Sequence, residues 1–189
     1  MGAYKKSSML LSYAGGTSEQ ASVTRISMNK FTVKKPTLYQ TTFSTCGQYR
    51  YEWLHRWAEG DYVMFIGLNP SIADCSMTDP TVRRCISYAK RWGYGALHMT
   101  NLFAWIDSDP AIMKRQARPV GAKNDATLQR VASQAGLVVA AWGRHGAHLN
   151  RGDVVKAMLP NLHALAVNRD GSPAHPLYLN GDLRPVPFS

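Results

Sequence analysis

The sequence predicts a single α/β domain of three layers, in which a mainly parallel central sheet has helices on both faces. Short apolar runs alternate with amphipathic segments along the chain, which is typical of strand and helix units in such folds. The length of 189 residues and the hydrophobic content of 45% are sufficient for one domain with a sizeable core. No internal repeat or linker is visible in the sequence.

The beginning of the chain predicts a leader followed by the folded domain. Residues 1–22 are rich in Ser, Gly and Thr and predict a flexible leader, so the domain is expected to span 23–189. The imperfect alternation at 23–33 indicates an edge strand. The apolar residues of 51–57 fall at helical spacing and predict a short amphipathic helix.

The core is expected to begin with the apolar run Tyr62–Leu68, which is typical of a strand buried on both faces. Asp79 as N-cap, Pro80 at the first helical position and Gly93 past the end predict the helix that follows. The remaining expected elements are a strand at 96–103, a helix at 124–135, a strand at 137–142, a helix at 153–159 and a strand at 162–167. The Pro-rich end, 173–188, is expected to be irregular.

The charge of the chain favours a polyanionic partner. Its formal net charge is +10 and its pI is about 9.7, which suits DNA or a nucleotide. Residues 1–58 carry eight Lys and Arg against two acids, and this basic segment either contacts phosphate or only keeps the terminus soluble. Lys30, Lys34 and Lys35 flank the expected edge strand and are expected to matter more for binding than residues 1–22.

The cysteines and the hydropathy indicate a cytoplasmic protein without a metal or other cofactor. Cys46, Cys75 and Cys85 show no spacing of a metal or iron–sulfur site and are expected to be reduced thiols. The N-terminal apolar run is too short for a signal peptide, and no stretch is long enough for a membrane helix. The oligomeric state stays open.

Polar residues follow the expected strands at the positions where such sheets place their sites. Asn69 follows the first strand, Asn101 lies within the end of the second, Trp142-Gly143 lies at the end of the third and His175 lies on the loop after the fourth. Binding sites of parallel sheets lie at the carboxyl ends of the strands. We therefore expect Asn69, Asn101 and His175 to converge on one cleft.

Each of these residues also has an ordinary structural interpretation. Asn69 either orients a water molecule or forms a simple turn, and Asn101 is hydrogen-bonded either by backbone or by a nucleobase edge. His175 lies in a Pro-rich loop, where it is either a rigidly held donor or a structural residue. Arg83 and Arg84 contact phosphate in one interpretation, whereas in the other Arg83 pairs with the helix cap four residues earlier.

The motifs that define several common enzyme classes are absent from the sequence. It contains no GxxxxGKS, GxGxxG, HExxH or GxSxG pattern, so NTPase, dinucleotide-binding, zincin and serine-hydrolase interpretations have no support. The ordered motifs over residues 48–188 instead resemble a bacterial and phage family of unassigned function. They are Gly67-Leu68-Asn69-Pro70-Ser71, Asp79-Pro80-Thr81-Val82-Arg83-Arg84, Thr100-Asn101-Leu102-Phe103-Ala104, Ala141-Trp142-Gly143 and His175-Pro176-Leu177-Tyr178-Leu179.

The same motifs, in the same order, are more distantly similar to the uracil-DNA-glycosylase superfamily. Gly67-Leu68-Asn69-Pro70 is similar to the water-activating motif of its mismatch-specific branch, in which Asn replaces the Asp used elsewhere. Thr100-Asn101 is similar to its pyrimidine-reading strand, and His175-Pro176 to the start of its second catalytic loop. The sequence departs from the pattern at Ser71, where that branch has Gly, and at Leu177-Tyr178, which replaces a small pair.

This resemblance implies hydrolysis of the N-glycosidic bond of a normal or modified pyrimidine in DNA by base flipping. Asn69 would position water, Asn101 would read the base and His175 would stabilise the leaving base. The other residues implied in substrate binding are Gly67, Leu68, Pro70, Ser71, Phe103, Trp142, Arg83 and Arg84. Two alternatives stay open, namely a non-catalytic nucleotide or nucleic-acid binding module and an enzyme that acts on free nucleotides.

Overall fold

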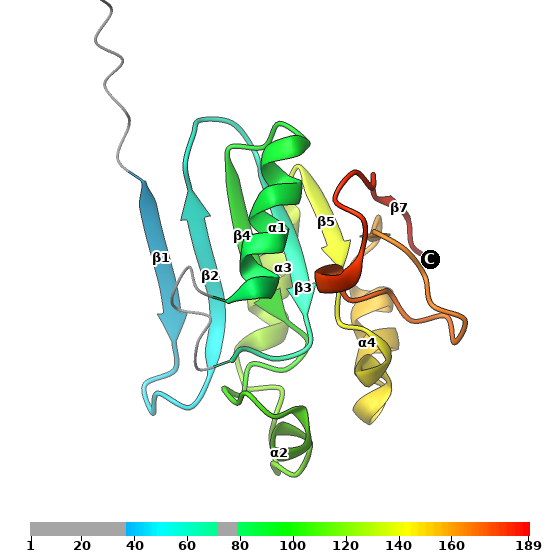
Figure 1. Ribbon diagram of the computed structural model, residues 1–189. Helices are drawn as coiled ribbons and strands as arrows, with labels where there is room; N and C mark the ends of the chain where they lie inside the picture. The colour runs from blue at the N-terminus through cyan, green and yellow to red at the C-terminus, as the bar shows by residue number, and fades with distance from the viewer. Residues whose placement is uncertain (1–36, 72–78) are drawn as a thin grey trace, which may run out of the picture. The chain divides into compact units, whose positions relative to one another are not determined.

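The computed structural model describes residues 37–71 and 79–189 (Figure 1). The expectations for the leader at 1–22, for the strand at 23–33, and for Lys30, Lys34, Lys35 and Cys75 lie outside the described residues. Within the described ranges, no helix combines the length and the apolar character needed to cross a membrane.

One seven-stranded sheet forms the centre of the fold, with the strand order β1-β2-β4-β3-β5-β6-β7. Its strands are β1 Leu38–Phe43, β2 Arg50–Arg56, β3 Tyr62–Gly67, β4 Ala96–Asn101, β5 Leu137–Ala140, β6 His163–Ala164 and β7 Val186–Pro187. The four strands expected from the apolar runs, β3 to β6, are mutually parallel neighbours.

The sheet as a whole is mixed, so the expectation of a mainly parallel sheet needs correction. Three pairs are antiparallel, namely β1 with β2, β2 with β4 and β6 with β7. β1 and β2 are joined by residues 44–49 alone, and so short a connection allows only antiparallel pairing because a parallel crossover needs a dozen residues or more.

The helix expected at 51–57 is wrong, because this segment is strand β2. β2 pairs with β1 on one side and with β4 on the other, and Tyr51 and Trp53 are both buried. Aromatic residues fit such a pleated, buried surface. The apparent helical spacing arose because both faces of this strand are largely covered, which hides the two-residue period.

The helices follow the expected order, with one addition. α1 spans Pro80–Arg91, α3 spans Asn124–Ser133 and α4 spans Arg151–Met158, while α2, Pro110–Lys114, is too short to show a periodicity in the sequence. The carboxylate of Asp79 accepts hydrogen bonds from the backbone N–H groups of Thr81 and Val82, as the cap prediction requires.

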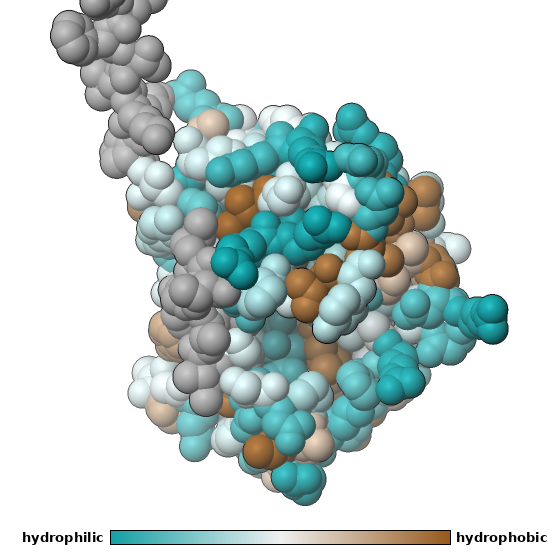
Figure 2. Space-filling model, in the orientation of Figure 1, coloured by the Kyte–Doolittle hydropathy of each residue, from teal (hydrophilic) through white to brown (hydrophobic). Residues whose placement is uncertain are grey.

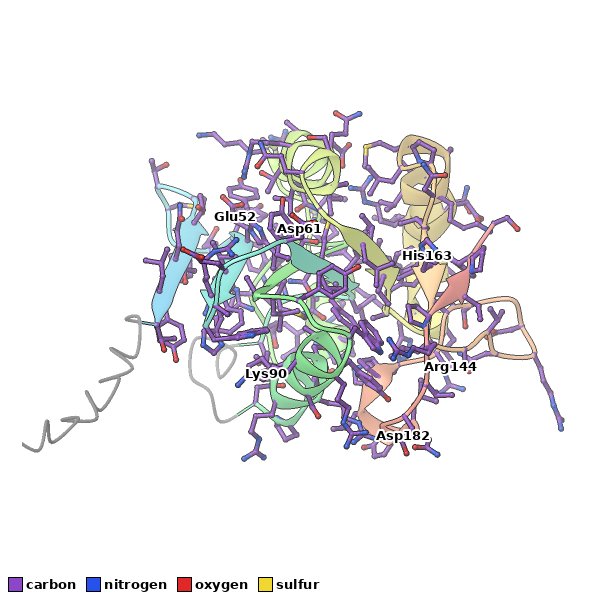
Figure 3. The ribbon with its side chains drawn as sticks, turned by 90° about the horizontal axis from the view of Figure 1, so that it is seen from above. Glu52, Asp61, Lys90, Arg144, His163 and Asp182 are labelled. Carbon is purple, nitrogen blue, oxygen red and sulfur yellow. The ribbon has the colours of Figure 1, made fainter. Side chains whose placement is uncertain are left out.

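The helices cover both faces of the sheet, with α1 on one face and α3 and α4 on the other (Figure 3). The side chains of β3 show why. Val63 and Phe65 pack with the α1 side, while Met64 and Ile66 pack into the cluster that contains α3 and α4 residues. All four are fully buried, so the continuous apolar run of this strand reflects two covered faces.

Candidate functional site

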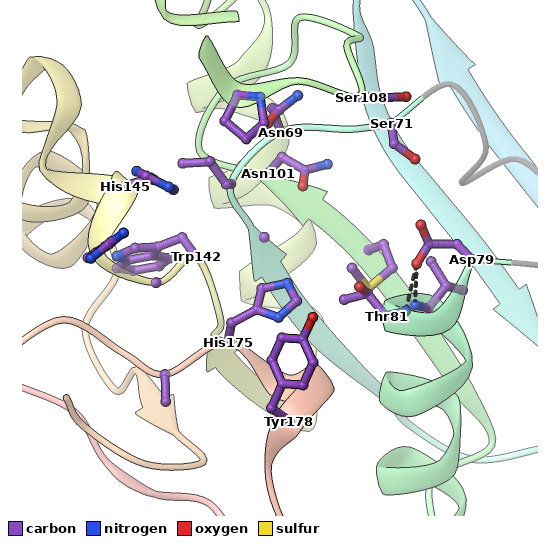
Figure 4. Close-up of a pocket in the computed structure, with 18 of the residues that line it drawn as sticks. Asn69, Ser71, Asp79, Thr81, Asn101, Ser108, Trp142, His145, His175 and Tyr178 are labelled. Atoms are coloured by element: carbon purple, nitrogen blue, oxygen red, sulfur yellow. Dashed lines mark hydrogen bonds between the residues drawn. The ribbon is translucent and has the colours of Figure 1, made fainter.

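A cavity of about 540 Å³ lies at the carboxyl ends of β3, β4 and β5 (Figure 4). Figure 2 shows the surface hollowed between α1 and α2, with hydrophobic and hydrophilic residues around the hollow. The volume is within the range of small-molecule sites. Of the residues selected from the sequence, those that line the cavity are Gly67, Leu68, Asn69, Ser71, Asn101, Trp142 and His175.

Asn101 is the last residue of β4 and is only 5% exposed. Its backbone carbonyl accepts a hydrogen bond from Asn124 Nδ2. Its side-chain amide has no hydrogen-bond partner among the residues that the structure describes, although it lines the cavity. Its donor and acceptor are therefore free to bond to water or to a ligand that enters the cavity.

Gly67 is the residue that makes room for this amide. It is the β3 residue in register with Asn101, and a Cβ placed on it would lie 2.6 Å from Asn101 Oδ1. The resemblance implied only that Gly67 takes part in substrate binding. The structure shows that the Asn101 side chain approaches Gly67 closely.

Asn69 lies just after β3 and its amide is oriented by backbone carbonyls. Nδ2 donates to the carbonyl oxygen of Asp107 at 2.7 Å and to that of Pro70 at 3.3 Å. Since the amide nitrogen is engaged in this way, Oδ1 is the atom that remains to accept a hydrogen bond from water or a ligand. Figure 4 shows Asn69 and Asn101 on the same side of the cavity.

His175 enters the cavity from the loop after β6 (Figure 4). It precedes the short 3-10 helix η3, Pro176–Tyr178, and its Nδ1 accepts a hydrogen bond from the backbone N–H of Leu177 at 3.4 Å. With Nδ1 as acceptor, the neutral ring carries its proton on Nε2 and can donate it. Desolvation at the cavity lowers the pKa of His175 below its usual value, and the Asp79 carboxylate opposes this only in part.

Four residues selected from the sequence do not line the cavity: Pro70, Phe103, Arg83 and Arg84. Phe103 is fully buried in the core. Arg84 donates to the carbonyl of Leu179, and its guanidinium lies over the ring of Tyr88, so it ties the C-terminal segment to α1. Arg83 is exposed on α1, outside the cavity.

Other polar residues of the cavity were not selected from the sequence as binding residues. The position rule that found Trp142 also points to Arg144 and His145, because they follow the same strand, and both line the cavity. Asp79 serves as helix cap and cavity wall at once. Tyr178 is 89% exposed at the edge of the cavity. Asp107 lies on the loop between β4 and α2, and no sequence signal marked it as a cavity residue.

No group of three or more His, Cys, Asp or Glu residues that could hold a metal ion occurs within residues 37–71 and 79–189. The polar groups that line the cavity include amides, hydroxyls, histidines with lowered pKa values and charged groups.

Comparison with known proteins gives one match. The sequence profile of a family described as "Protein of unknown function (DUF1643)" matches residues 50–177, a range that includes Asn69, Asn101 and His175. No curated protein and no solved structure matches the chain. The expected relation to a family of unassigned function is thereby shown, and the more distant likeness to uracil-DNA glycosylases stays a prediction.

Proposed function

The chain belongs to the DUF1643 family, and from its cavity we propose that it recognises a nucleobase and hydrolyses the N-glycosidic bond between that base and its sugar. The observation that carries the proposal is the buried Asn101 amide, which has no partner among the described residues and lines the cavity. Because the Asn101 amide lies open to the cavity, a ligand that both donates to and accepts from it replaces water there, with a net gain of about 0.5–1.5 kcal/mol per hydrogen bond.

A nucleobase edge has the chemistry that this amide requires. Oδ1 and Nδ2 lie in one plane and offer an acceptor beside a donor, and a planar base edge offers the complementary pair. Leu68, Met99 and Trp142 add apolar surface to the lining, which suits the faces of a base.

Asn69 and His175 supply what bond cleavage needs. As the bond between C1′ and the base nitrogen breaks, the sugar becomes oxocarbenium-like and the base gains negative charge. A water molecule that donates to Asn69 Oδ1 is positioned to add its oxygen to C1′, and its proton passes to solvent. The Nε2–H of neutral His175 donates to the departing base and stabilises its charge.

The proposal is tested by incubating the wild-type protein with oligonucleotides and mononucleotides that carry normal and modified pyrimidines, and by measuring released base chromatographically. We expect release from at least one substrate, and a loss of both binding and release in Asn101→Ala. Asn180→Ala is the matched control, since Asn180 is exposed and lies outside the cavity.

The outcome also separates an enzyme from a binding module. If the wild-type protein binds a base through Asn101 and releases none from any substrate, the cavity belongs to a binding module. If no substrate binds, or if Asn101→Ala and Asn180→Ala behave alike, the nucleobase proposal fails.

A further inference from the structure

One side of the cavity carries a group of nitrogen-bearing side chains that the proposed reaction does not use. Arg144 and His145 line the cavity, and Lys114 Nζ lies 3.0 Å from His145 Nδ1. Arg144 and His145 begin the 3-10 helix η2, Arg144–Asn150, after β5, whereas Lys114 ends α2 after β4. Two separate loops at the carboxyl edge of the sheet thus contribute to one group, which we call the basic rim (Lys114, Arg144, His145).

The guanidinium of Arg144 has no hydrogen-bond partner within the described part of the chain. Arg144 is exposed and makes no hydrogen bond or ion pair to another described residue. The nearby Asp170 is held mainly by the hydroxyl and backbone N–H of Ser172, and Arg144 is the smallest of the influences that lower its pKa. The planar guanidinium therefore offers its donors to a ligand.

Lys114 donates a hydrogen bond to His145, and His145 can in turn donate one to a ligand. An ammonium group only donates, so His145 Nδ1 must be the acceptor of their contact, and the neutral ring carries its proton on Nε2. Burial, Lys114 and Arg144 together hold the pKa of His145 below its usual value. The basic rim is therefore a region of positive potential that already disfavours a further proton.

Among the described residues, no carboxylate forms a hydrogen bond or an ion pair with Lys114, Arg144 or His145. Asp79 caps α1, and Figure 4 shows Asp79 and His145 on opposite sides of the cavity. Asp107 accepts a hydrogen bond from the backbone N–H of Asp109. An anion at the basic rim would relieve the repulsion among its groups and accept hydrogen bonds from them.

We propose that Lys114, Arg144 and His145 form a phosphate subsite, which binds a phosphate attached to the nucleoside whose base reaches Asn101. This inference rests on the proposed function, because Asn101 supplies the base end of the ligand. The cavity volume of about 540 Å³ exceeds what one planar base fills and leaves space for a sugar and its phosphate. The phosphate belongs either to a free nucleotide or to a DNA strand, and the two sources are separated experimentally.

The test compares four ligands by calorimetric titration: inorganic phosphate, a pyrimidine deoxynucleoside, its 5′-monophosphate and a short single-stranded oligonucleotide. The proteins are the wild type, Arg144→Gln, Lys114→Gln and the control Arg83→Gln, whose arginine is exposed outside the cavity. We expect each rim variant to bind the phosphorylated ligand about 10-fold more weakly, as the loss of one charged hydrogen bond implies. Nucleoside affinity should be unchanged in every variant.

A second readout does not depend on base recognition. Inorganic phosphate bound at the basic rim should raise the pKa of His145, which imidazole NMR shifts report as a function of pH. The rise should be much smaller in Arg144→Gln and unaffected in Arg83→Gln.

The outcomes distinguish this inference from the proposed function. If the monophosphate binds and the rim variants weaken its binding, the phosphate belongs to a free nucleotide. If only the oligonucleotide binds in this rim-dependent way, the phosphate belongs to a DNA strand. Either result supports the subsite. Equal affinities of nucleoside and phosphorylated ligands, or equal losses in Arg83→Gln and Arg144→Gln, overturn the subsite while base binding stands. Rim-dependent phosphate binding without nucleoside binding would instead remove the nucleobase proposal and retain the anion subsite.

Discussion

The position of the Asn101 amide depends on the absence of a side chain at Gly67. Because a Cβ at this position would lie 2.6 Å from Asn101 Oδ1, Gly67→Ala should displace the amide and abolish base binding. The overpacking should destabilise the fold by about 1–3 kcal/mol, which leaves it folded. Ligand titration and thermal denaturation measure the two effects.

The control for this substitution is Gly181→Ala, where a Cβ would meet mainly the ends of flexible arginine side chains. It should bind like the wild type. Wild-type base affinity in Gly67→Ala would show that the contact between Gly67 and Asn101 does not position the ligand-binding amide.

His175 should give the reaction a defined pH dependence. Since desolvation lowers its pKa below the usual value of 6.5, the neutral ring persists through neutral pH and is lost only in more acidic solution. Protonation leaves the Nε2–H in place but adds a proton to Nδ1, which can then no longer accept from Leu177, so the ring loses the contact that orients it and base release should fall. Folding stability changes in the same direction, because protonation is disfavoured in the folded state.

The rate of base release measured from pH 5 to 8 checks this expectation. His175→Gln can keep a donor without titrating, so it should retain part of the activity and lose the acidic limb, whereas His175→Ala should lose most of the activity. An acidic limb that persists in His175→Gln would assign the titration to another group.

The sequence was sufficient to predict that Asn69, Asn101 and His175 lie at one cavity, because the carboxyl edge of a parallel sheet gathers residues that follow its strands. The sequence could not show that Gly67 makes room for the Asn101 amide or that Arg84 contacts the C-terminal segment. The first depends on the register between β3 and β4, and the second on the C-terminal segment that lies against α1. Both are contacts between residues far apart in the chain.

At the level of elements, β2 contributes a buried acid that links it to its neighbours. Glu52 contacts His98 Nε2 of β4 at 3.0 Å, Thr42 Oγ1 of β1 at 2.8 Å and Arg130 of α3 at 2.6 Å. The hydrogen bond with His98 is the largest influence that lowers the pKa of Glu52 to about 2, and the contacts with Arg130 and Thr42 act in the same direction. This group lies on the sheet face that α3 covers (Figure 3).

Glu52 should make the fold sensitive to acid. Because the pKa of Glu52 is lowered from 4.5 to about 2, its contribution is present above the unfolded-state value and is lost as the pH falls through the folded value. We expect a loss of roughly 2–3 kcal/mol in the free energy of unfolding between pH 6 and pH 2. Denaturant titrations should show this loss in the wild type and a smaller one in Glu52→Gln. Identical pH profiles would contradict a stabilising ionised Glu52.

The elements that could not be predicted from the sequence share a physical cause. β1 is an edge strand with mostly exposed residues, and α2 has only five residues, so neither shows a clear apolar period. Because β1 was not predicted, the sequence contained no sign that β2 pairs with an antiparallel neighbour. The apolar residues of β2 were therefore interpreted as helical. The inner strands were predictable because burial on both faces leaves long apolar runs.

For the whole molecule, the net charge of +10 predicts that binding to a DNA strand weakens with added salt. Replacing Lys30, Lys34 and Lys35 by Gln should lower the slope of log affinity against log salt by about one for each phosphate that the protein no longer neutralises. Deletion of residues 1–22 should change the slope less. An unchanged affinity and slope in the triple variant would exclude these lysines from the DNA interface.

The measurement that tests the proposed nucleobase recognition most directly is the NMR response of the Asn101 side-chain amide to pyrimidine nucleosides. If this amide is the base-reading group, its Nδ2–H resonances should shift saturably with at least one nucleoside, while those of the exposed Asn180 stay in place. Saturable binding without a change at Asn101, or the absence of binding by any nucleoside or nucleotide, would contradict recognition of a nucleobase in this cavity.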